Sequence, residues 1–292
     1  MALDFTLSES QQVLQKNARE FAERVLEPIV EKIDRSADAW ESFLAGREAY
    51  RQTAQAGFAK SFIPVFYGGA GLTVLDIAIA AEELSRADVN IPTTMLANGL
   101  ALYPIIHYGT PEQKEHFLRP FADDAAGDLL AACAFTDVAG GANFDSPDPA
   151  GGIQTIAERD GDEWVITGEK HYTTNGTGWD KKGCQLYTVI CRTDPAAAAD
   201  DGGRAQELAI MAKVYCSEAA TTAVYDCMRL VGIASYTKNL SPLERIMRDA
   251  MAFPLYDGGN LGMRRRQLHD MFRQPGYDSM LAAHGEVPPW ET

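Results

Sequence analysis

The first third of the chain carries apolar residues at the spacing of an α-helix. Five of them recur mostly every four residues: Leu14, Phe21, Val25, Ile29 and Ile33. Side chains at that spacing share one face, so the pattern predicts a helix from the capping-box sequence Ser8-Glu-Ser-Gln11 to about Ile33, bent at Pro28. Similar patterns predict helices over residues 39–57, 74–86 and 92–108, and a further helix with Thr110 as its N-cap residue.

The pattern changes after residue 127 to short apolar runs separated by Gly, Asp and Pro. Residues 153–159 and 163–167 flank Asp160-Gly161, which is a signal for a type I′ hairpin turn. Residues 184–191 are rich in β-forming side chains and predict a further strand. We therefore expect a small β domain over residues 128–193.

A second change follows at residues 194–203, which are small, polar and end in two glycines, as is typical of a linker. Helices are then predicted over residues 206–231 and from Ser241 onward. The predicted fold class is α+β. It consists of an N-terminal α-helical domain over residues 1–127, the small β domain, the linker, and C-terminal helices over residues 204–292.

Composition and charge narrow the function classes. The chain has 292 residues and a net charge of -15, which argues against a nucleic acid or an anionic membrane as a partner. No apolar stretch approaches the roughly 20 residues of a membrane helix, and the N-terminus lacks the basic start of a secretory signal, so a cytoplasmic location is expected. Five cysteines without Cys-x-x-Cys spacing and five scattered histidines predict reduced thiols and no metal site.

One carboxylate has an unusual sequence setting. Asp257 lies at a Gly-Gly break between an apolar run and an Arg-rich helical start. Glycines let the backbone approach a ligand closely, and the N-terminus of a helix favours an anion. If a helix resumes there, Arg264 lies two turns along the same face and favours the ionised form of Asp257. The alternative interpretation is that Asp257 is an N-cap residue and residues 264–266 are a solvated face.

Several motifs, taken in order, resemble the acyl-CoA dehydrogenase family, and within it the branch that includes nitroalkane oxidase. The N-terminal motifs are Ile63-Pro-Val-Phe-Tyr-Gly-Gly69, Glu82-Glu-Leu84 and Tyr108-Gly-Thr-Pro-Glu-Gln-Lys114. The later motifs are Asp162-Glu-Trp-Val-Ile-Thr-Gly-Glu-Lys170, Asp249-Ala-Met and Tyr256-Asp-Gly-Gly259.

The resemblance implies an oxidoreductase that binds FAD, takes a proton from a carbon next to an electron-withdrawing group, and passes reducing equivalents to flavin N5. The catalytic residues implied are Asp257, which stands where the common branch has a glutamate base, and Arg264. Thr136 falls on the hydroxyl residue of one flavin loop, and Thr174 lies near flavin N5 in a second. The full set implied to bind the cofactor is Phe135, Thr136, Tyr172, Thr174, Gly258, Gly259 and Asn260.

The resemblance also implies a loss. Family members continue the β domain after the strand that ends here at Arg192, and then add two long helices. Here the linker leads into Ala212-Lys-Val-Tyr-Cys-Ser-Glu-Ala-Ala220, which resembles a later helix of the family's C-terminal bundle. The expected fold is therefore a partial acyl-CoA dehydrogenase fold, lacking part of the β domain and of the bundle, and a homo-oligomer is possible.

Three functions are open at this point. The first is α,β-dehydrogenation of an acyl-CoA thioester by Asp257 and FAD. The second is a nitroalkane-oxidase-like reaction, for which a shorter base suffices because a nitroalkane is already acidic. The third is a truncated, catalytically silent family member that acts as an interaction protein. Absorbance of oxidised flavin in the purified protein separates the third from the other two.

Overall fold

The computed structural model describes residues 6–138, 140–141, 150–194, 207–238, 240–256, 258–273 and 277. These residues form two compact units. Unit 1 contains the described residues up to Phe135 and those from Tyr172 to Ile190. Unit 2 contains the described residues from Thr136 to His171 and from Cys191 onward.

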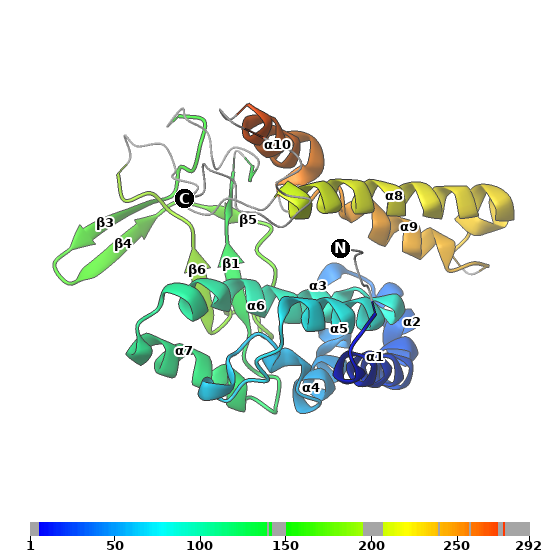
Figure 1. Ribbon diagram of the computed structural model, residues 1–292, viewed down its shortest axis with the longest axis horizontal. Helices are drawn as coiled ribbons and strands as arrows, with labels where there is room; N and C mark the ends of the chain where they lie inside the picture. The colour runs from blue at the N-terminus through cyan, green and yellow to red at the C-terminus, as the bar shows by residue number, and fades with distance from the viewer. Residues whose placement is uncertain are drawn as a thin grey trace. The chain divides into compact units, whose positions relative to one another are not determined.

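Unit 1 is built mainly from helices (Figure 1). The α-helices are α1 (Glu9–Phe21), α2 (Val30–Asp34), α3 (Ala39–Ala45), α4 (Arg47–Gln55), α5 (Val74–Ala87), α6 (Asn90–Tyr108) and α7 (Pro111–Asp123). Shorter turns are η1 (Ala22–Leu26), η2 (Glu27–Ile29), η3 (Phe58–Lys60) and η4 (Val65–Tyr67). The helices predicted over residues 74–86, over residues 92–108 and after Thr110 are therefore confirmed.

Local sequence signals explain where these helices begin and end. Ser8 and Thr110 each form a capping box with the glutamine three residues later, at the starts of α1 and α7. The regular helix is interrupted over residues 22–29, which include Pro28. The helix predicted over residues 39–57 is instead two helices, α3 and α4. They meet at Gly46, where an added Cβ would lie 2.8 Å from Ile91 Cδ1.

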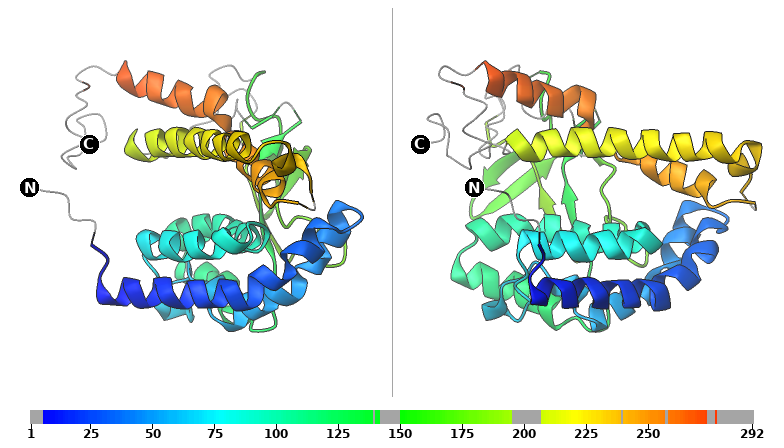
Figure 2. Two further views of the ribbon diagram at one scale, coloured as in Figure 1. Left: turned by 90° about the vertical axis from the view of Figure 1, so that its right-hand side faces the viewer. Right: turned by 45° about the vertical axis from the view of Figure 1, so that its right-hand side comes forward.

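The core of unit 1 lies between α1, α4, α5 and α6, and Figure 2 shows α1 alongside α5. Its fully buried side chains include Leu26, Tyr50, Leu84 and Met95. Burying a large apolar side chain contributes about 1.5–3 kcal/mol, so these side chains contribute strongly to the stability of this unit.

Two strands complete unit 1. Strand β1 (Ala131–Ala134) pairs in parallel with β6 (Leu186–Val189), and α6 packs on both strands. The pairing is reinforced from the helix, since the Thr188 hydroxyl donates to the Ala101 carbonyl at 2.6 Å. The predicted strand over residues 184–191 is confirmed, and it comes from a segment well separated in sequence from its partner.

Unit 2 has two short antiparallel pairs. Strand β2 (Thr136–Asp137) pairs with β5 (Lys170–His171), and β3 (Ile156–Asp160) pairs with β4 (Glu163–Thr167). The hairpin is as predicted, but its turn is not. Asp160 pairs with Glu163, so the turn residues are Gly161 and Asp162, and only Gly161 has a positive φ, +62°. The turn therefore lies one residue later than expected, and within it the Arg159 side chain donates to the Gly161 carbonyl at 3.0 Å.

The helices of unit 2 are α8 (Glu207–Val231), η5 (Ile233–Tyr236), α9 (Leu243–Ala252), η6 (Gly259–Arg264) and α10 (Arg265–Phe272). Helix α9 packs along α8, and η6 with α10 packs on α8 as well (Figures 1 and 2). The predicted α+β class is confirmed, whereas the domain boundaries at residues 127, 193 and 203 stay predictions. Within the described ranges, none of the helices is long and apolar enough to cross a membrane.

Candidate functional site

The segment around Asp257 connects α9 to η6 in unit 2. Asp257 itself lies outside the described residues, but its neighbours on both sides are described. The structure therefore shows how the chain is held immediately before and immediately after the predicted base.

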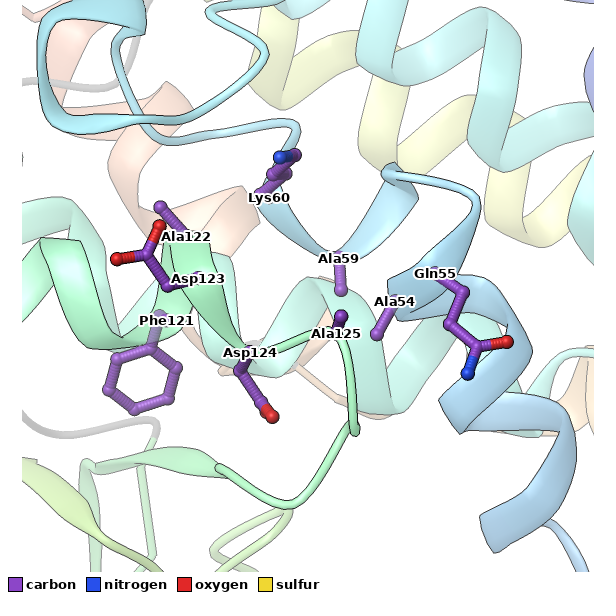
Figure 3. Close-up of a pocket in the computed structure, with 9 residues that line it drawn as sticks. All are labelled: Ala54, Gln55, Ala59, Lys60, Phe121, Ala122, Asp123, Asp124 and Ala125. Atoms are coloured by element: carbon purple, nitrogen blue, oxygen red, sulfur yellow. The ribbon is translucent and has the colours of Figure 1, made fainter.

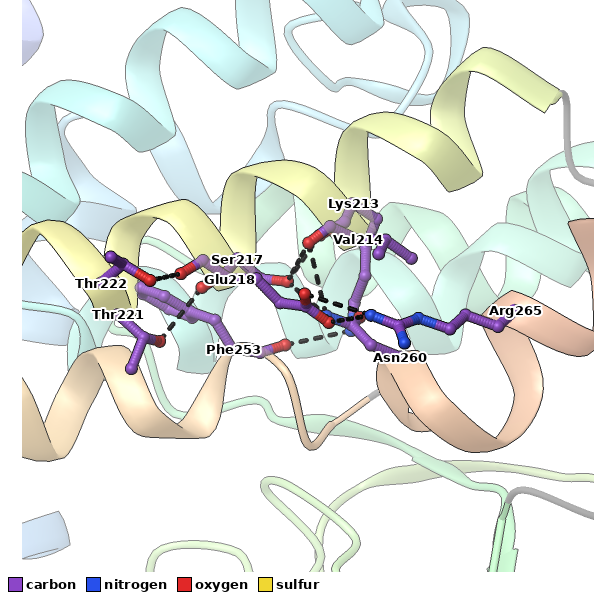
Figure 4. A network of polar contacts seen from close by, with 9 residues as sticks. All are labelled: Lys213, Val214, Ser217, Glu218, Thr221, Thr222, Phe253, Asn260 and Arg265. Atoms are coloured by element: carbon purple, nitrogen blue, oxygen red, sulfur yellow. Dashed lines mark hydrogen bonds and ion pairs between the residues drawn. The ribbon is translucent and has the colours of Figure 1, made fainter.

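Lys213 of α8 holds the chain before Asp257. Its ammonium donates to the Phe253 carbonyl at 3.0 Å and to the side-chain oxygen of Asn260 at 2.8 Å (Figure 4). It also donates to the Tyr256 carbonyl at 3.2 Å. Carbonyls at the end of a helix have no partner within the helix, and a cation is favoured at that end. Lys213 thus binds α8 to the end of α9 and to the residue directly before Asp257.

Asn260 holds the chain after Asp257. Its side chain is 2% exposed, and its amide nitrogen donates to the Ser217 hydroxyl at 2.8 Å and to Glu218 Oε1 at 3.3 Å. Arg265 pairs with the same Glu218 carboxylate at 2.9 Å (Figure 4). The contact of Asn260 with a cofactor stays a prediction, but its side-chain amide is already used inside the fold.

Two glycines follow Asp257 in left-handed conformations. Gly258 has a φ of +79° and Gly259 a φ of +72°, a region that side-chain-bearing residues rarely adopt. An added Cβ at Gly258 would collide with Met263, which is buried. Gly258 is also the N-cap residue of η6.

The helix resumes after the glycines, as expected. Arg264 ends η6, is half-buried, and its guanidinium donates to Gln267 Oε1 at 3.0 Å. The roles of Asp257 and Arg264 in catalysis stay predictions, although the predicted change from loop to helix between them is present.

Thr136, the first predicted flavin hydroxyl, lies in β2 of unit 2 and is half-buried. The next residue, Asp137, is 5% exposed and forms an ion pair with Lys170 of β5, with 2.6 Å between Oδ1 and Nζ. The Thr155 hydroxyl also donates to Asp137 Oδ1, at 2.7 Å, and the Gln154 backbone N–H donates to Oδ2. Asp137 therefore gathers three segments of unit 2 next to Thr136.

The surroundings of Asp137 favour its ionised form. Burial alone raises the pKa of a carboxyl group, because it removes water from the charge. Here the hydrogen bonds from Lys170, Thr155 and Gln154 outweigh burial, and the pKa of Asp137 is lowered. The carboxylate is a structural anchor that stays charged at neutral pH.

The second predicted flavin loop, residues 172–176, belongs to unit 1. Asn175 has a φ of +68° and is buried, and its amide nitrogen donates to the Thr94 carbonyl at 2.9 Å and to Asn98 Oδ1 at 3.0 Å. The adjacent Thr174 is exposed, and Tyr172 is 92% exposed with a φ of +54°. A rigid anchor thus presents the Thr174 hydroxyl to solvent.

The predicted cofactor residues are divided between the two units. Phe135, Tyr172 and Thr174 belong to unit 1, whereas Thr136, Gly258, Gly259 and Asn260 belong to unit 2. Within unit 2, Gly258, Gly259 and Asn260 directly follow Asp257 in sequence.

A hollow of about 250 Å³ lies elsewhere in unit 1 (Figure 3). Its walls come from α4, η3 and α7, and its polar groups include Lys60, Asp123 and Asp124. The Asp124 carboxylate already accepts from the backbone N–H groups of residues 128 and 129. The hollow contains none of the residues predicted to act in catalysis or cofactor binding.

The sequence had assigned no role to Lys213, although a signal for it exists. Lys213, Ser217 and Thr221 form a polar stripe at four-residue spacing on α8. Each contacts the segment from α9 to η6, with Thr221 donating to the Ala250 carbonyl at 3.1 Å. Asp137 and Asn175 were also missed, since nothing local distinguishes them from ordinary strand and turn residues.

Comparison with protein families decides the relationship. The family models described as "Acyl-CoA dehydrogenase, N-terminal domain" and "Acyl-CoA dehydrogenase, C-terminal domain" match residues 8–125 and 192–270. The chain belongs to the acyl-CoA dehydrogenase family. The resemblance seen in the sequence motifs is confirmed, and with it the family's fold.

Individual relatives within the acyl-CoA dehydrogenase family point to the nitroalkane oxidase branch. The chain is 26% identical to nitroalkane oxidase of Podospora anserina over 434 aligned residues, covering 99% of the chain and all of the relative. It is 34% identical to short-chain specific acyl-CoA dehydrogenase of Bos taurus over 188 residues, covering 64% of this chain and 42% of the relative.

A solved structure gives the same result for the fold. It is a structure of the flavoprotein nitroalkane oxidase, from work on the roles of one arginine and one aspartate in the reaction. The two chains superimpose with a TM-score of 0.87 and are 22% identical, and the match covers 97% of this chain and all of the other. This acyl-CoA dehydrogenase family member is nevertheless short. The Podospora alignment has 434 positions against 292 residues here, so about a third of the alignment has no residue in this chain.

Proposed function

We propose that this chain is an FAD-dependent oxidoreductase that removes a proton from a carbon next to an electron-withdrawing group, with Asp257 as the base and a nitroalkane as the substrate class. The enzyme class, a flavin oxidoreductase, and its cofactor, FAD, follow from membership of the acyl-CoA dehydrogenase family. The substrate, the base and the residues around the flavin are the parts proposed here.

The observation that carries the proposal is the way the loop around Asp257 is held. Lys213 binds the Tyr256 carbonyl on one side and Asn260 is buried on the other, so the chain is anchored on both sides of Asp257. In the solved nitroalkane oxidase, the named aspartate and arginine lie seven positions apart. Asp257 and Arg264 have the same spacing in this chain.

The proposed reaction begins with proton transfer from the substrate carbon to the Asp257 carboxylate. A nitroalkane is already acidic at that carbon, so a base with one methylene less than glutamate suffices. Arg264, the cation seven positions after Asp257, is proposed to favour the ionised carboxylate that can accept the proton. The carbon keeps the electron pair of the broken C–H bond, and FAD, when bound, would supply the electron acceptor.

The residues of this chain fit a bound flavin. The Thr174 hydroxyl is exposed on a loop that Asn175 anchors, so it can donate to the flavin without giving up a contact within the fold. Thr136 precedes the buried Asp137, whose ion pair with Lys170 anchors this strand. Donors fixed in advance near flavin N5 stabilise the negative charge of the reduced state.

An acyl-CoA thioester is the second candidate substrate. The specific observation in its favour is the 34% identity to the bovine short-chain dehydrogenase over 188 residues, which is higher than the identity to nitroalkane oxidase. That match covers only 64% of this chain, whereas the nitroalkane oxidase match covers 99% of it. The breadth of the second match favours the nitroalkane.

A direct experiment separates these functions. The purified chain is saturated with FAD, its flavin absorbance is recorded, and it is mixed without oxygen with nitroalkanes and, separately, with acyl-CoA thioesters. Bleaching by nitroalkanes supports the proposal, and bleaching by thioesters alone overturns the substrate in favour of the second candidate. Failure to bind FAD supports the catalytically silent alternative.

We also propose that the chain self-associates and that it is cytoplasmic. Several large apolar side chains of unit 2 are more than half exposed: Leu230, Ile233, Leu240, Leu255 and Leu261. Exposed apolar side chains in such number favour a homo-oligomer. Light scattering tests this by measuring the molar mass of the protein in solution. The proposed cytoplasmic location rests on the sequence, in which the five cysteines form no Cys-x-x-Cys pair.

A further inference from the structure

We propose that Lys213 and Asn260 are positioning residues for the proposed base, since they hold the described chain on both sides of Asp257, at Tyr256 and at Asn260, against α8. This inference rests on the proposed role of Asp257 as the base. It adds two residues, neither of which has to touch the substrate, and it assigns them a measurable effect on the reaction.

The loop needs an external anchor. Gly258 and Gly259 directly follow Asp257, and glycine loses more backbone freedom on folding than any other residue. A base next to two glycines samples many positions unless other contacts restrict it. Proton transfer is sensitive to this, because a displacement of ~1 Å can cost ~100-fold in rate.

Lys213 provides the first anchor. An ammonium group has three donors, and here it donates to Phe253 O, Tyr256 O and Asn260 Oδ1, all between 2.8 and 3.2 Å. Figure 4 shows the contacts to Phe253 and Asn260. The ammonium also lies 5.4 Å from the centre of the Tyr256 ring. Two of these contacts are made to the residue that immediately precedes Asp257.

Asn260 provides the second anchor. Its oxygen accepts from Lys213, and its nitrogen donates to Ser217 and Glu218 on the next turn of α8. Its backbone N–H donates to the Pro254 carbonyl at 2.9 Å. Because Lys213 bonds both Tyr256 and Asn260, the two ends of the loop are joined through one side chain.

The first test measures the loop without any substrate. Hydrogen exchange is followed at the backbone N–H groups of Gly259 and Asn260, which donate to the Tyr256 and Pro254 carbonyls. In the FAD-loaded full chain we expect faster exchange at both in Lys213→Met and in Asn260→Ala. The matched control is Thr221→Val, which removes one bond between α8 and α9 at Ala250, away from the loop. Unchanged exchange in Lys213→Met, or equally fast exchange in Thr221→Val, overturns the anchoring role.

The second test separates positioning from general stability. With the substrate that bleaches the wild-type flavin, we expect Lys213→Met to lower the rate of flavin reduction by ~100-fold and to leave the substrate dissociation constant nearly unchanged. Thr221→Val keeps the wild-type rate. If Lys213→Met exchanges its loop N–H groups faster but reduces the flavin at the wild-type rate, Lys213 does not position the base.

A double variant gives an independent check. Because Lys213 and Asn260 bond each other, their effects on the rate are not additive, whereas those of Lys213 and Thr221 are. Additive effects of Lys213→Met and Asn260→Ala contradict a joint anchor. If none of the tested substrates reduces the flavin of the wild-type chain, the proposed function fails. The exchange experiment still decides whether Lys213 and Asn260 hold the loop.

Discussion

The carboxylate of Asp137 lies 2.6 Å from the ammonium of Lys170, and both side chains are less than a tenth exposed. The pair joins β2 to β5 beside Thr136. Removing one member of a buried ion pair costs about 3–5 kcal/mol, because the other charge stays buried without its partner. The pair is therefore expected to be a major determinant of the stability of unit 2.

The first prediction concerns this pair. Asp137→Asn is expected to lower the free energy of unfolding by about 3–5 kcal/mol, as measured by denaturant titration. The control is Asp226→Asn, which removes the exposed ion pair between Asp226 and Arg229 and is expected to cost less than about 1 kcal/mol. Similar losses in the two variants would show that burial of the Asp137 pair carries no special stability.

The pH dependence of stability gives a second prediction. The pKa of Asp137 is lowered in the folded chain, so the unfolded chain binds more protons as the pH falls through this range. The stabilisation is complete above the unfolded pKa of roughly 3.9 and is lost as the pH falls through the folded value. The difference in unfolding free energy between wild type and Asp137→Asn should shrink below about pH 4. A difference that stays constant from pH 6 down to pH 2 contradicts this account.

The two glycines after Asp257 allow a matched comparison. Both have positive φ, so both alanine variants carry similar backbone strain, but only at Gly258 does the new methyl collide with Met263. We expect Gly258→Ala to lose more thermal stability and more flavin reduction than Gly259→Ala. Equal effects would mean that the packing of Met263 against the loop does not matter.

Thr174 offers a test of the flavin environment. Thr174→Val removes the exposed hydroxyl, and we expect weaker FAD binding or a more negative flavin reduction potential, since a donor to the reduced flavin is lost. Thr177→Val, an exposed threonine three residues later, serves as the control. FAD affinity and potential equal to wild type in Thr174→Val would remove this residue from the site.

The comparison of sequence and structure separates local from distant signals. The starts of α1 and α7 could be predicted because Ser8 with Gln11, and Thr110 with Gln113, satisfy each other within one turn. The hairpin was also predictable, but its turn lies one residue later than expected, since Asp160 pairs with Glu163 and the Arg159 side chain donates to the Gly161 carbonyl within the turn. That contact depends on a rotamer that no sequence pattern specifies.

The candidate site shows the same division more sharply. Asp257, Gly258, Gly259 and Arg264 could be found from one stretch of sequence. The family motif lies there, and so do the carboxylate, the glycine break and the arginine that the proposed reaction needs. Lys213 lies 47 residues from Asn260 in sequence, and their contact forms only when α8 packs on the segment after α9. Asp137 and Lys170 meet across β2 and β5 for the same reason. Such pairs depend on tertiary packing, which local patterns do not encode.

The central claim is that Asp257 takes the proton from the substrate. The most direct measurement is stopped-flow flavin reduction without oxygen, comparing wild type with Asp257→Asn at matched FAD content. The account predicts that Asp257→Asn keeps its fold and its flavin but reduces that flavin about 10²- to 10⁴-fold more slowly, the usual contribution of a catalytic base. Reduction of the flavin in Asp257→Asn at the wild-type rate would contradict the assignment of the base.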